Sequence, residues 1–371
     1  MGQQAAGQQE KAAYLSVEGA QVGYGETVVV RDVDLSVCRG QILTLVGPNG
    51  SGKSTILKSI IGQLKLTGGV VYLDGREMGA MSARDVARRL SILMTERMQP
   101  ELMTCWDVVA TGRYPYTGRM GVLTDEDKAI VDESLALVSA GDLAERDFTA
   151  VSDGQRQRIL RARALCQQPE IIVLDEPTSF LDIHHKLELL SILKDMVRTR
   201  QLAVIMSLHE IDLAQRVSDV VACVHNGRIE RIGSPEEVFT ERNVSHLYGL
   251  GPGVYNEAFS SVELPRVTGS PRVFVIGGAG SGISAYRVLQ RLQIPFAAGV
   301  LASNDVDFPV AKALATEVVD VGAFCPVDED ACRQARSIID GVECVIMCVD
   351  ARTPANEGNH LLFEAAAASG K

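Results

Sequence analysis

The chain has 371 residues, of which 46% are hydrophobic and 22% are charged. These values exclude an intrinsically disordered chain, and the length favours two or three domains of about 150 residues each. Lys and Arg number 36 and Asp and Glu number 47, giving a net charge of −11; this argues against DNA or RNA as the main partner, because binding a phosphate backbone requires a basic surface.

Neither a membrane span nor a signal peptide is predicted. The sequence has no continuous apolar run of about 18 residues, the length that a spanning helix requires. Residues 1–12 are rich in Gln and Ala and lack an apolar core, so we interpret them as a flexible N-terminus. The eight Cys form no CxxC pair and lie mostly in apolar runs, which favours buried thiols in a reducing compartment.

The first half of the chain alternates between strand and helix patterns. A strand ends at residues 43–46, and a glycine-rich turn and a helical stretch over 54–64 follow. Residues 124–140 have helical apolar spacing, with acidic residues in the first turn. Residues 171–174 and 202–206 are apolar on both faces, which predicts buried parallel strands with helices between them.

A change of character follows, since Gly and Pro crowd residues 248–270 without a period and indicate a linker. A new alternation then predicts a second, smaller α/β unit over 271–371. The chain stops at Lys371 directly after a helical stretch, where another strand is expected, which suggests truncation. The strands predicted in this unit are 273–276, 297–302, 317–321 and 344–349.

The turn after the first strand fits the phosphate-binding pattern G-x-x-x-x-G-K-[ST]. Its backbone N–H groups would converge on phosphates, and the helix N-terminus adds about half a positive charge. Lys53 would bridge the β- and γ-phosphates, and the Ser54 hydroxyl would bind Mg²⁺. The alternative, a merely structural turn, is disfavoured by the position between strand and helix. The predicted nucleotide-binding residues here are Gly47, Pro48, Asn49, Gly50, Ser51, Gly52, Lys53, Ser54 and Thr55.

Two carboxylates follow the strand at residues 171–174, at the strand end where ligands bind in parallel sheets. Asp175 would hold Mg²⁺ through water, and Glu176 would polarise the attacking water as general base. An ordinary strand end would explain the pair taken alone. Its position downstream of a phosphate-binding turn favours the catalytic interpretation.

A third element is the pentapeptide Val151-Ser152-Asp153-Gly154-Gln155 before a helical stretch. With the two preceding motifs, it resembles the nucleotide-binding domain of ABC transporters, an α/β P-loop ATPase cassette, over about residues 13–247. The family's usual pentapeptide is L-S-G-G-Q, so Val151 and Asp153 are departures. The resemblance implies that Ser152, Gly154 and Gln155, which are retained, face the nucleotide phosphate.

The same resemblance implies roles for single residues. Tyr24 occupies the place of an aromatic ring that stacks on adenine, and His209 matches the switch histidine that contacts the γ-phosphate. Residues 179–182 match the D-loop. Taken alone, Tyr24 would more often be a packing residue and His209 a structural one. Thr95 stands where the family has Gln; its shorter hydroxyl would still touch Mg²⁺ or water.

Three stretches of the cassette resemble importers of iron-siderophores, haem and cobalamin: 111–116, 152–158 and 181–190. The resemblance implies an ATP-binding subunit that hydrolyses ATP to drive an importer, with ATP and Mg²⁺ as cofactors. Two copies would pair head to tail and enclose the nucleotide. Transmembrane permease subunits would dock near residues 95–120, with a substrate-binding protein, which places the chain in the cytoplasm on the inner face of the cell membrane.

An alternative function is a soluble ABC ATPase whose C-terminal domain senses a ligand without transport. The C-terminal unit itself resembles a Rossmann domain, because a glycine-rich turn follows its first strand, although Ile283 departs from the usual pattern. Asn304 and Asp305 would meet a ribose hydroxyl. A ligand sensor, a packing or interaction module and an oxidoreductase all remain open. A small ligand or nucleotide would lie at Gly278, Gly280 and Gly282.

Overall fold

The protein is described from a computed structural model. Its described residues form two compact units, which divide between Val238 and Phe239 and are treated separately below. The predictions for residues 1–11, for Thr95 and for the Tyr24 side chain lie outside the described part. The structure describes residues 12–24, 27–93, 102–118, 120–179, 181–251, 254–257 and 259–371, without the side chains of Tyr24 and Thr27.

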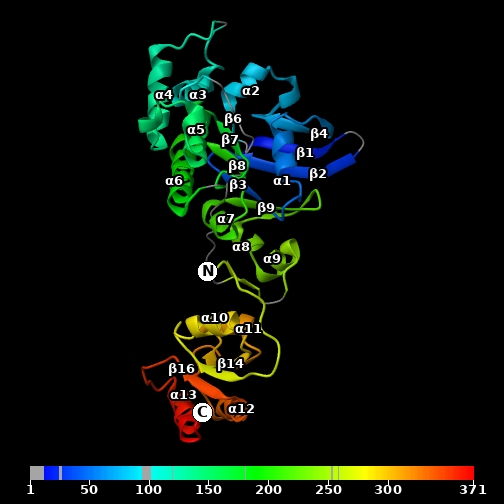
Figure 1. Ribbon diagram of the computed structural model, residues 1–371. Coiled ribbons are helices and arrows are strands. Elements are labelled where there is room, and N and C mark those ends of the chain that lie inside the picture. Colours follow the sequence, from blue (N-terminus) through cyan, green and yellow to red (C-terminus); the bar gives the residue numbers. More distant parts are fainter. Residues whose placement is uncertain are drawn as a thin grey trace, which may run out of the picture. The chain divides into compact units, whose positions relative to one another are not determined.

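The first unit is built on a six-stranded sheet with the order β10-β9-β3-β8-β7-β6 (Figure 1). All neighbouring strands are parallel except the pair β9 and β10. Every residue of β3, β7 and β8 is buried, as expected for strands that pack on both faces. The six strands are β3 (Ile42–Val46), β6 (Leu90–Leu93), β7 (Ile171–Leu174), β8 (Ala203–Ser207), β9 (Val220–His225) and β10 (Arg228–Gly233).

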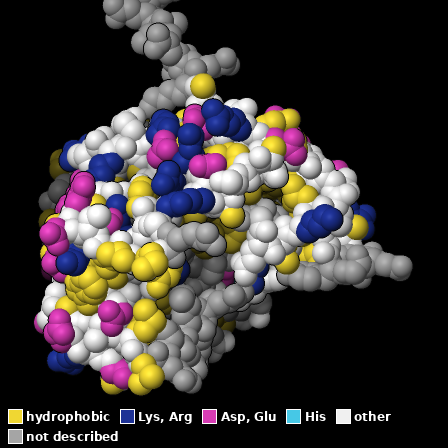
Figure 2. Space-filling view, turned by 90° about the horizontal axis from the view of Figure 1, so that it is seen from above, with side chains coloured by type: hydrophobic (Ala, Val, Ile, Leu, Met, Phe, Trp, Pro, Cys, Tyr) yellow, Lys and Arg dark blue, Asp and Glu magenta, His cyan; other side chains and the backbone are white. Residues whose placement is uncertain are grey.

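The first unit also contains helices, three of which pack against one another: α5 contacts both α3 and α4. Figure 2 views the end of the unit that carries α2, α3 and α4, where hydrophobic side chains gather in several places. Within the described ranges, no helix is long and apolar enough to cross a membrane. The helices are α1 (Lys53–Ile60), α2 (Ala83–Arg89), α3 (Cys105–Ala110), α4 (Asp125–Leu137), α5 (Asp153–Cys166), α6 (Ile183–Arg200), α7 (Ile211–Val217) and α8 (Pro235–Val238).

A second sheet of the first unit is antiparallel, with the order β2-β1-β4-β5. In β2 the residues Val33, Leu35 and Val37 are buried, and the residues between them are exposed, so one face points to the core. The strands are β1 (Ala13–Tyr24), β2 (Thr27–Cys38), β4 (Leu66–Leu73) and β5 (Arg76–Glu77).

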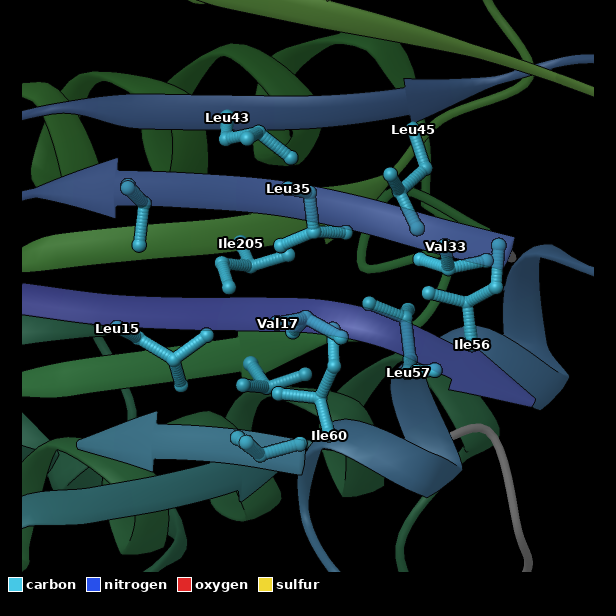
Figure 3. Packing of buried hydrophobic residues seen from close by; sticks show 14 of the residues in the cluster. Leu15, Val17, Val33, Leu35, Leu43, Leu45, Ile56, Leu57, Ile60 and Ile205 are labelled. Atoms are coloured by element: carbon cyan, nitrogen blue, oxygen red, sulfur yellow. The ribbon is translucent and has the colours of Figure 1, made fainter. Parts of the chain in front are cut away.

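Helix α1 shares one hydrophobic core with both sheets of the first unit. Its residues Ile56, Leu57 and Ile60 lie in one cluster with Leu15 of β1 and Leu45 of β3 (Figure 3). Each fully buried Leu or Ile side chain contributes about 1.5–3 kcal/mol to folding. This core therefore anchors the helix that directly follows the glycine-rich turn.

The region around α4 is held by a buried ion pair. Arg113 Nε donates to Asp127 Oδ1 at 2.8 Å, and both side chains are almost fully buried. Arg113 Nη1 also donates to the carbonyl oxygen of Cys166, the last residue of α5. Asp127 in turn accepts hydrogen bonds from the N–H group and hydroxyl of Thr124, the N-cap of α4. One guanidinium thus joins the start of α4 to the end of α5.

We expect Arg113→Leu to lower the free energy of unfolding by about 3–5 kcal/mol, because it leaves the Asp127 carboxylate buried without its cation. Urea unfolding of the full chain measures this loss. The double variant Arg113→Leu, Asp127→Asn should recover part of it, since no charge then remains unpaired. A loss below about 1 kcal/mol, the range of surface pairs, would contradict the expectation.

The second unit is a parallel sheet with the order β15-β14-β13-β16, preceded by one helix and a two-stranded sheet. One core contains residues of α10 and α11, and another contains residues of α12 and α13, which is typical of a doubly wound sheet. Its elements are α9 (Glu241–Tyr248), β11 (Tyr255–Asn256), β12 (Ser261–Val262), β13 (Val273–Ile276), α10 (Ile283–Arg291), β14 (Phe296–Ala302), α11 (Asp307–Leu314), β15 (Glu317–Val321), α12 (Glu329–Ile339), β16 (Cys344–Met347) and α13 (Glu357–Ala368).

The strand order of the second unit defines where a ligand would bind. Strand β13 lies between β14 and β16, so the chain leaves it toward one side and returns on the other. In such sheets a crevice opens at the carboxyl ends of the strands at this switch point. The glycine-rich turn after Ile276 lies at that edge. The stretch 248–270, which the sequence predicts as a linker, contains the two short strands β11 and β12. The domain boundaries that we expect from the sequence remain a prediction.

Candidate functional site

The glycine-rich turn of the first unit joins the buried strand β3 to α1. Gly47 has a φ of +148°, and a Cβ there would lie 2.1 Å from the carbonyl oxygen of Val224, so only glycine fits. Lys53 Nζ donates to the carbonyl oxygens of Gly47 at 2.7 Å and Pro48 at 3.0 Å. The buried Ser51 hydroxyl has no partner within the described part of the chain. The turn therefore presents an ammonium group and an unpaired hydroxyl beside its backbone.

Two opposing electrostatic effects act on the pKa of Lys53. Burial lowers the pKa of Lys53, while the carboxylates of Glu176 and Asp175 oppose this shift. Lys53 is 5% exposed, so little water screens these charges. A buried cation that faces two carboxylates suits a ligand with several negative charges and an accompanying divalent cation.

Asp175 follows β7 and lies beside the phosphate-binding turn. Its Oδ1 accepts a hydrogen bond from Ser54 Oγ at 3.1 Å and another from Ser207 Oγ at 2.8 Å. Asp175 is 4% exposed, so the carboxylate is fixed in a largely dry site. Converging carboxylate and hydroxyl oxygens are ligands that Mg²⁺ prefers, so Ser54 and Asp175 fit the predicted metal site.

Glu176 contacts two residues that the sequence treats as separate motifs. His209 Nε2 lies 2.5 Å from Glu176 Oε1, and Ser179 Oγ donates to Oε2 at 3.2 Å. The Glu176 N–H group donates to Ser207 Oγ at 2.9 Å. These contacts are possible because β7 and β8 are adjacent parallel strands that end at the same edge. The carboxylate is thus oriented by an imidazole and a hydroxyl.

Ser207 is a residue that the sequence analysis missed. It is fully buried at the end of β8 and pairs in register with Leu45 of β3. Its hydroxyl donates to Asp175 and accepts from the Glu176 N–H group, so it links the metal and base positions. The one signal in the sequence is a polar residue at the end of a buried strand, shortly before His209.

We expect Ser207→Ala to lower ATP hydrolysis about 10- to 100-fold, because it removes the hydrogen bonds that orient Asp175 and Glu176. Phosphate release at saturating ATP measures the effect. Ser134→Ala is a matched control, since Ser134 is a buried serine of α4 whose hydroxyl donates to the Ile130 carbonyl of the same helix and contacts none of the catalytic carboxylates. Equal rates for the two variants would contradict the role given to Ser207.

The signature residues lie at the start of α5. Ser152 is the N-cap: its hydroxyl accepts from the Gln155 N–H group at 3.3 Å, and its N–H group donates to Gln155 Oε1 at 3.0 Å. A Cβ added at Gly154 would meet nothing within 4 Å, so the helix start is open on that side. Asp153 forms an ion pair with Arg156 at 2.9 Å. An open, capped helix N-terminus is a suitable anion site.

The glycine-rich turn of the second unit is closed by its own acidic residues. Gly278 and Gly282 donate their N–H groups to Asp307 Oδ2, at 2.6 Å and 3.0 Å. The Ala279 N–H group donates to both oxygens of Asp305, at 3.0 Å and 2.9 Å. Burial raises the pKa of Asp307, and the nearby Asp305 adds to this. Asn304, predicted to meet a ribose, accepts from the Phe324 N–H group.

The fold and the first site define a P-loop nucleoside triphosphatase. Residues 30–179 match the ABC transporter family, and residues 296–371 match the MJ0874 family. The uncharacterized ABC transporter ATP-binding protein MJ0873 of Methanocaldococcus jannaschii is 43% identical over 289 residues, which cover 78% of this chain and all of that protein. The chain therefore belongs to the family of ABC transporter ATP-binding proteins, and its first unit is an ABC ATPase cassette.

Other relatives are named as ATP-binding proteins of import systems. The iron(3+)-hydroxamate import ATP-binding protein of Bacillus subtilis is 38% identical, over 64% of this chain and 88% of its own length. The cobalamin import ATP-binding protein of Halobacterium salinarum is 32% identical, over 85% of this chain and 80% of its own length. A solved metal-chelate type ABC transporter in an inward-facing conformation matches with 25% identity and a TM-score of 0.56, over 64% of this chain and 89% of that one.

Proposed function

We propose that this protein powers the import of a metal chelate, such as an iron-siderophore, haem or cobalamin, by hydrolysing ATP. The observation that carries the proposal is the convergence of the catalytic groups at one edge of the six-stranded sheet: Ser54 contacts Asp175, and Glu176 contacts His209. The substrate class rests on the relatives, whose names include iron(3+)-hydroxamate, petrobactin and cobalamin import.

In this proposal the turn holds the triphosphate through backbone N–H groups, and Lys53 moves its hydrogen bonds from the Gly47 and Pro48 carbonyls to the phosphates. Mg²⁺, held by Ser54 and through water by Asp175, would neutralise phosphate charge. Glu176 accepts the proton of the attacking water, and His209 keeps its carboxylate in place. The further nucleotide roles proposed above for Tyr24 and Thr95 concern side chains outside the described residues.

A second copy of the chain would complete the site. We place the open start of α5, with Ser152, Gly154 and Gln155, against the nucleotide of the other copy in a head-to-tail homodimer. A solved cassette dimer, the bacterial ABC transporter cassette MJ0796, matches this chain with 25% identity and a TM-score of 0.54, over 60% of this chain and 98% of that one. Loss of the γ-phosphate would remove contacts that hold the two copies together, and the dimer would reopen.

The permease subunits would dock on the end of the first unit seen in Figure 2. In the predicted docking stretch, Leu102 is 96% exposed and Met120 is 88% exposed, so both large apolar side chains are accessible to a partner. We expect the wild-type chain to co-purify with membranes, and Leu102→Asp together with Met120→Asp to reduce this at least about tenfold, because each buries a charge at the interface.

Fractionation of cells followed by immunoblotting measures this association, and metal analysis of the purified complex identifies the chelate. Ile232→Asp, at an exposed position of β10, is the control and should leave the chain on the membrane. A wild-type chain that hydrolyses ATP but never fractionates with membranes would favour the alternative, an ATPase not coupled to transport.

We also infer that the second unit carries a small-ligand site at its glycine-rich turn, near Gly278, Gly280 and Gly282. The support is the position of the turn at the carboxyl edge of the sheet, at the switch point between β14 and β16. In this proposal the unit senses a ligand and regulates the cassette.

A further inference from the structure

A buried arginine holds the carbonyl group of the residue that follows the candidate base. Arg161 lies on α5 and is 4% exposed. Its Nη2 donates to the carbonyl oxygen of Pro177 at 3.1 Å. Because proline has no N–H group, this carbonyl is the only backbone group through which Pro177 can form a hydrogen bond. Arg161 therefore fixes the chain one residue after Glu176.

The surroundings of this guanidinium group are unusual for a residue that only packs a helix. In the part of the chain that the structure describes, no ion pair is recorded for Arg161, and its buried Nε has no hydrogen-bond partner. Burial lowers the pKa of Arg161 to about 10; Arg158 adds to this shift and Glu188 opposes it. Since it is costly to take an unpaired cation out of water, an apolar side chain would suit simple packing better.

The backbone at Glu176 requires support from its surroundings. Its φ is +48°, in the left-handed region that residues with a side chain rarely adopt, and the following proline disfavours the right-handed helical conformation. Such a conformation persists only where neighbouring groups determine it. On one side of Glu176, its own N–H group donates to Ser207 Oγ. On the other side, Arg161 holds the Pro177 carbonyl.

We propose that Arg161 is a positioning residue for ATP hydrolysis, which holds the Pro177 carbonyl from α5 and thereby keeps the Glu176 carboxylate at its contact with His209. The proposal rests on the assignment of Glu176 as the general base. The competing explanation is that Arg161 only supports the start of α5, where Ser152 lies about 14 Å away along the helix axis at 1.5 Å per residue.

Arg161→Met tests the proposal, because methionine keeps an unbranched apolar stem and removes the donor. We expect kcat to fall about tenfold and the dissociation constant for ATP to stay within about twofold, since a misplaced base lowers turnover without weakening binding of the ground state. Phosphate release in a single turnover and calorimetry with ATP measure the two quantities. Arg161→Lys, which keeps one cationic donor, should recover part of kcat.

Arg84→Met is the matched control. Arg84 Nε also donates to a proline carbonyl, that of Pro115, at 2.9 Å, but this loop carries none of the catalytic carboxylates. The control should hydrolyse ATP at the wild-type rate.

A double-variant cycle separates positioning of the base from a purely structural role. In the Glu176→Gln background, Arg161→Met should lower the residual rate less than about twofold, because no carboxylate base is left to misplace. An equal fall in both backgrounds, or an unchanged kcat in the wild-type background, would overturn the proposal. Loss of the ATP-induced dimer in Arg161→Met, read by light scattering, would also overturn it in favour of support for the start of α5.

The same set of variants distinguishes failure of this proposal from failure of the base assignment. If Glu176→Gln hydrolyses ATP at the wild-type rate, the base assignment is wrong and the role of Arg161 falls with it. If Glu176→Gln is inactive while Arg161→Met is fully active, only the role of Arg161 is wrong.

Discussion

Replacement of Glu176 by Gln should lower steady-state ATP hydrolysis at least about 100-fold while leaving ATP binding intact, since general-base catalysis contributes about 10²–10⁴-fold. The amide keeps the shape of the carboxylate and can still contact His209 and Ser179, but it cannot accept a proton from water. Because the γ-phosphate then persists, the ATP-bound dimer should accumulate. Phosphate release measures the first effect, and light scattering with ATP measures the second.

Glu170→Gln is the matched control, because Glu170 lies at the opposite end of β7 and pairs with Arg39. It should hydrolyse ATP at the wild-type rate and show no trapped dimer. Turnover by Glu176→Gln at the wild-type rate would refute the base assignment. A variant that binds ATP and stays monomeric would instead refute the head-to-tail dimer.

The strands that could be predicted from the sequence are those that are apolar on both faces. Residues 171–174 and 273–276 form strands with the predicted bounds, because such runs are buried wherever the chain goes. Strands β1 and β2 were not predicted. Their buried residues alternate with exposed ones, and β1 pairs with β4, far along the chain, so tertiary contacts decide their register.

In the candidate site, too, some residues could be predicted from the sequence and others only from the tertiary structure. Motif spacing indicated Lys53, Ser54, Asp175, Glu176 and His209, but not that His209 contacts Glu176. Ser207 carries no motif, and its importance follows only from the adjacency of β7 and β8. In the second unit, glycine spacing indicated a turn open to phosphate. Spacing cannot show that Asp307, on another helix, occupies the N–H groups of that turn.

Substitution of Lys53 by Ala should raise the dissociation constant for ATP about 100-fold, because truncating one partner of a buried charge pair costs about 2–5 kcal/mol. The ammonium group is 5% exposed and already hydrogen-bonded to the Gly47 and Pro48 carbonyls, so it is positioned at the turn before nucleotide arrives. Its charge is also balanced against Asp175 and Glu176, so its loss leaves two carboxylates facing the phosphates.

Isothermal titration calorimetry with ATP and Mg²⁺ measures this loss of affinity. Lys128→Ala is the control, since Lys128 is an exposed residue of α4 whose ion pair with Asp125 stays within one helix. It should bind ATP as the wild type does. If Lys53→Ala bound ATP with unchanged affinity, the phosphate would have to be held by backbone N–H groups and the start of α1 alone, and the buried ammonium group would then serve only to close the turn.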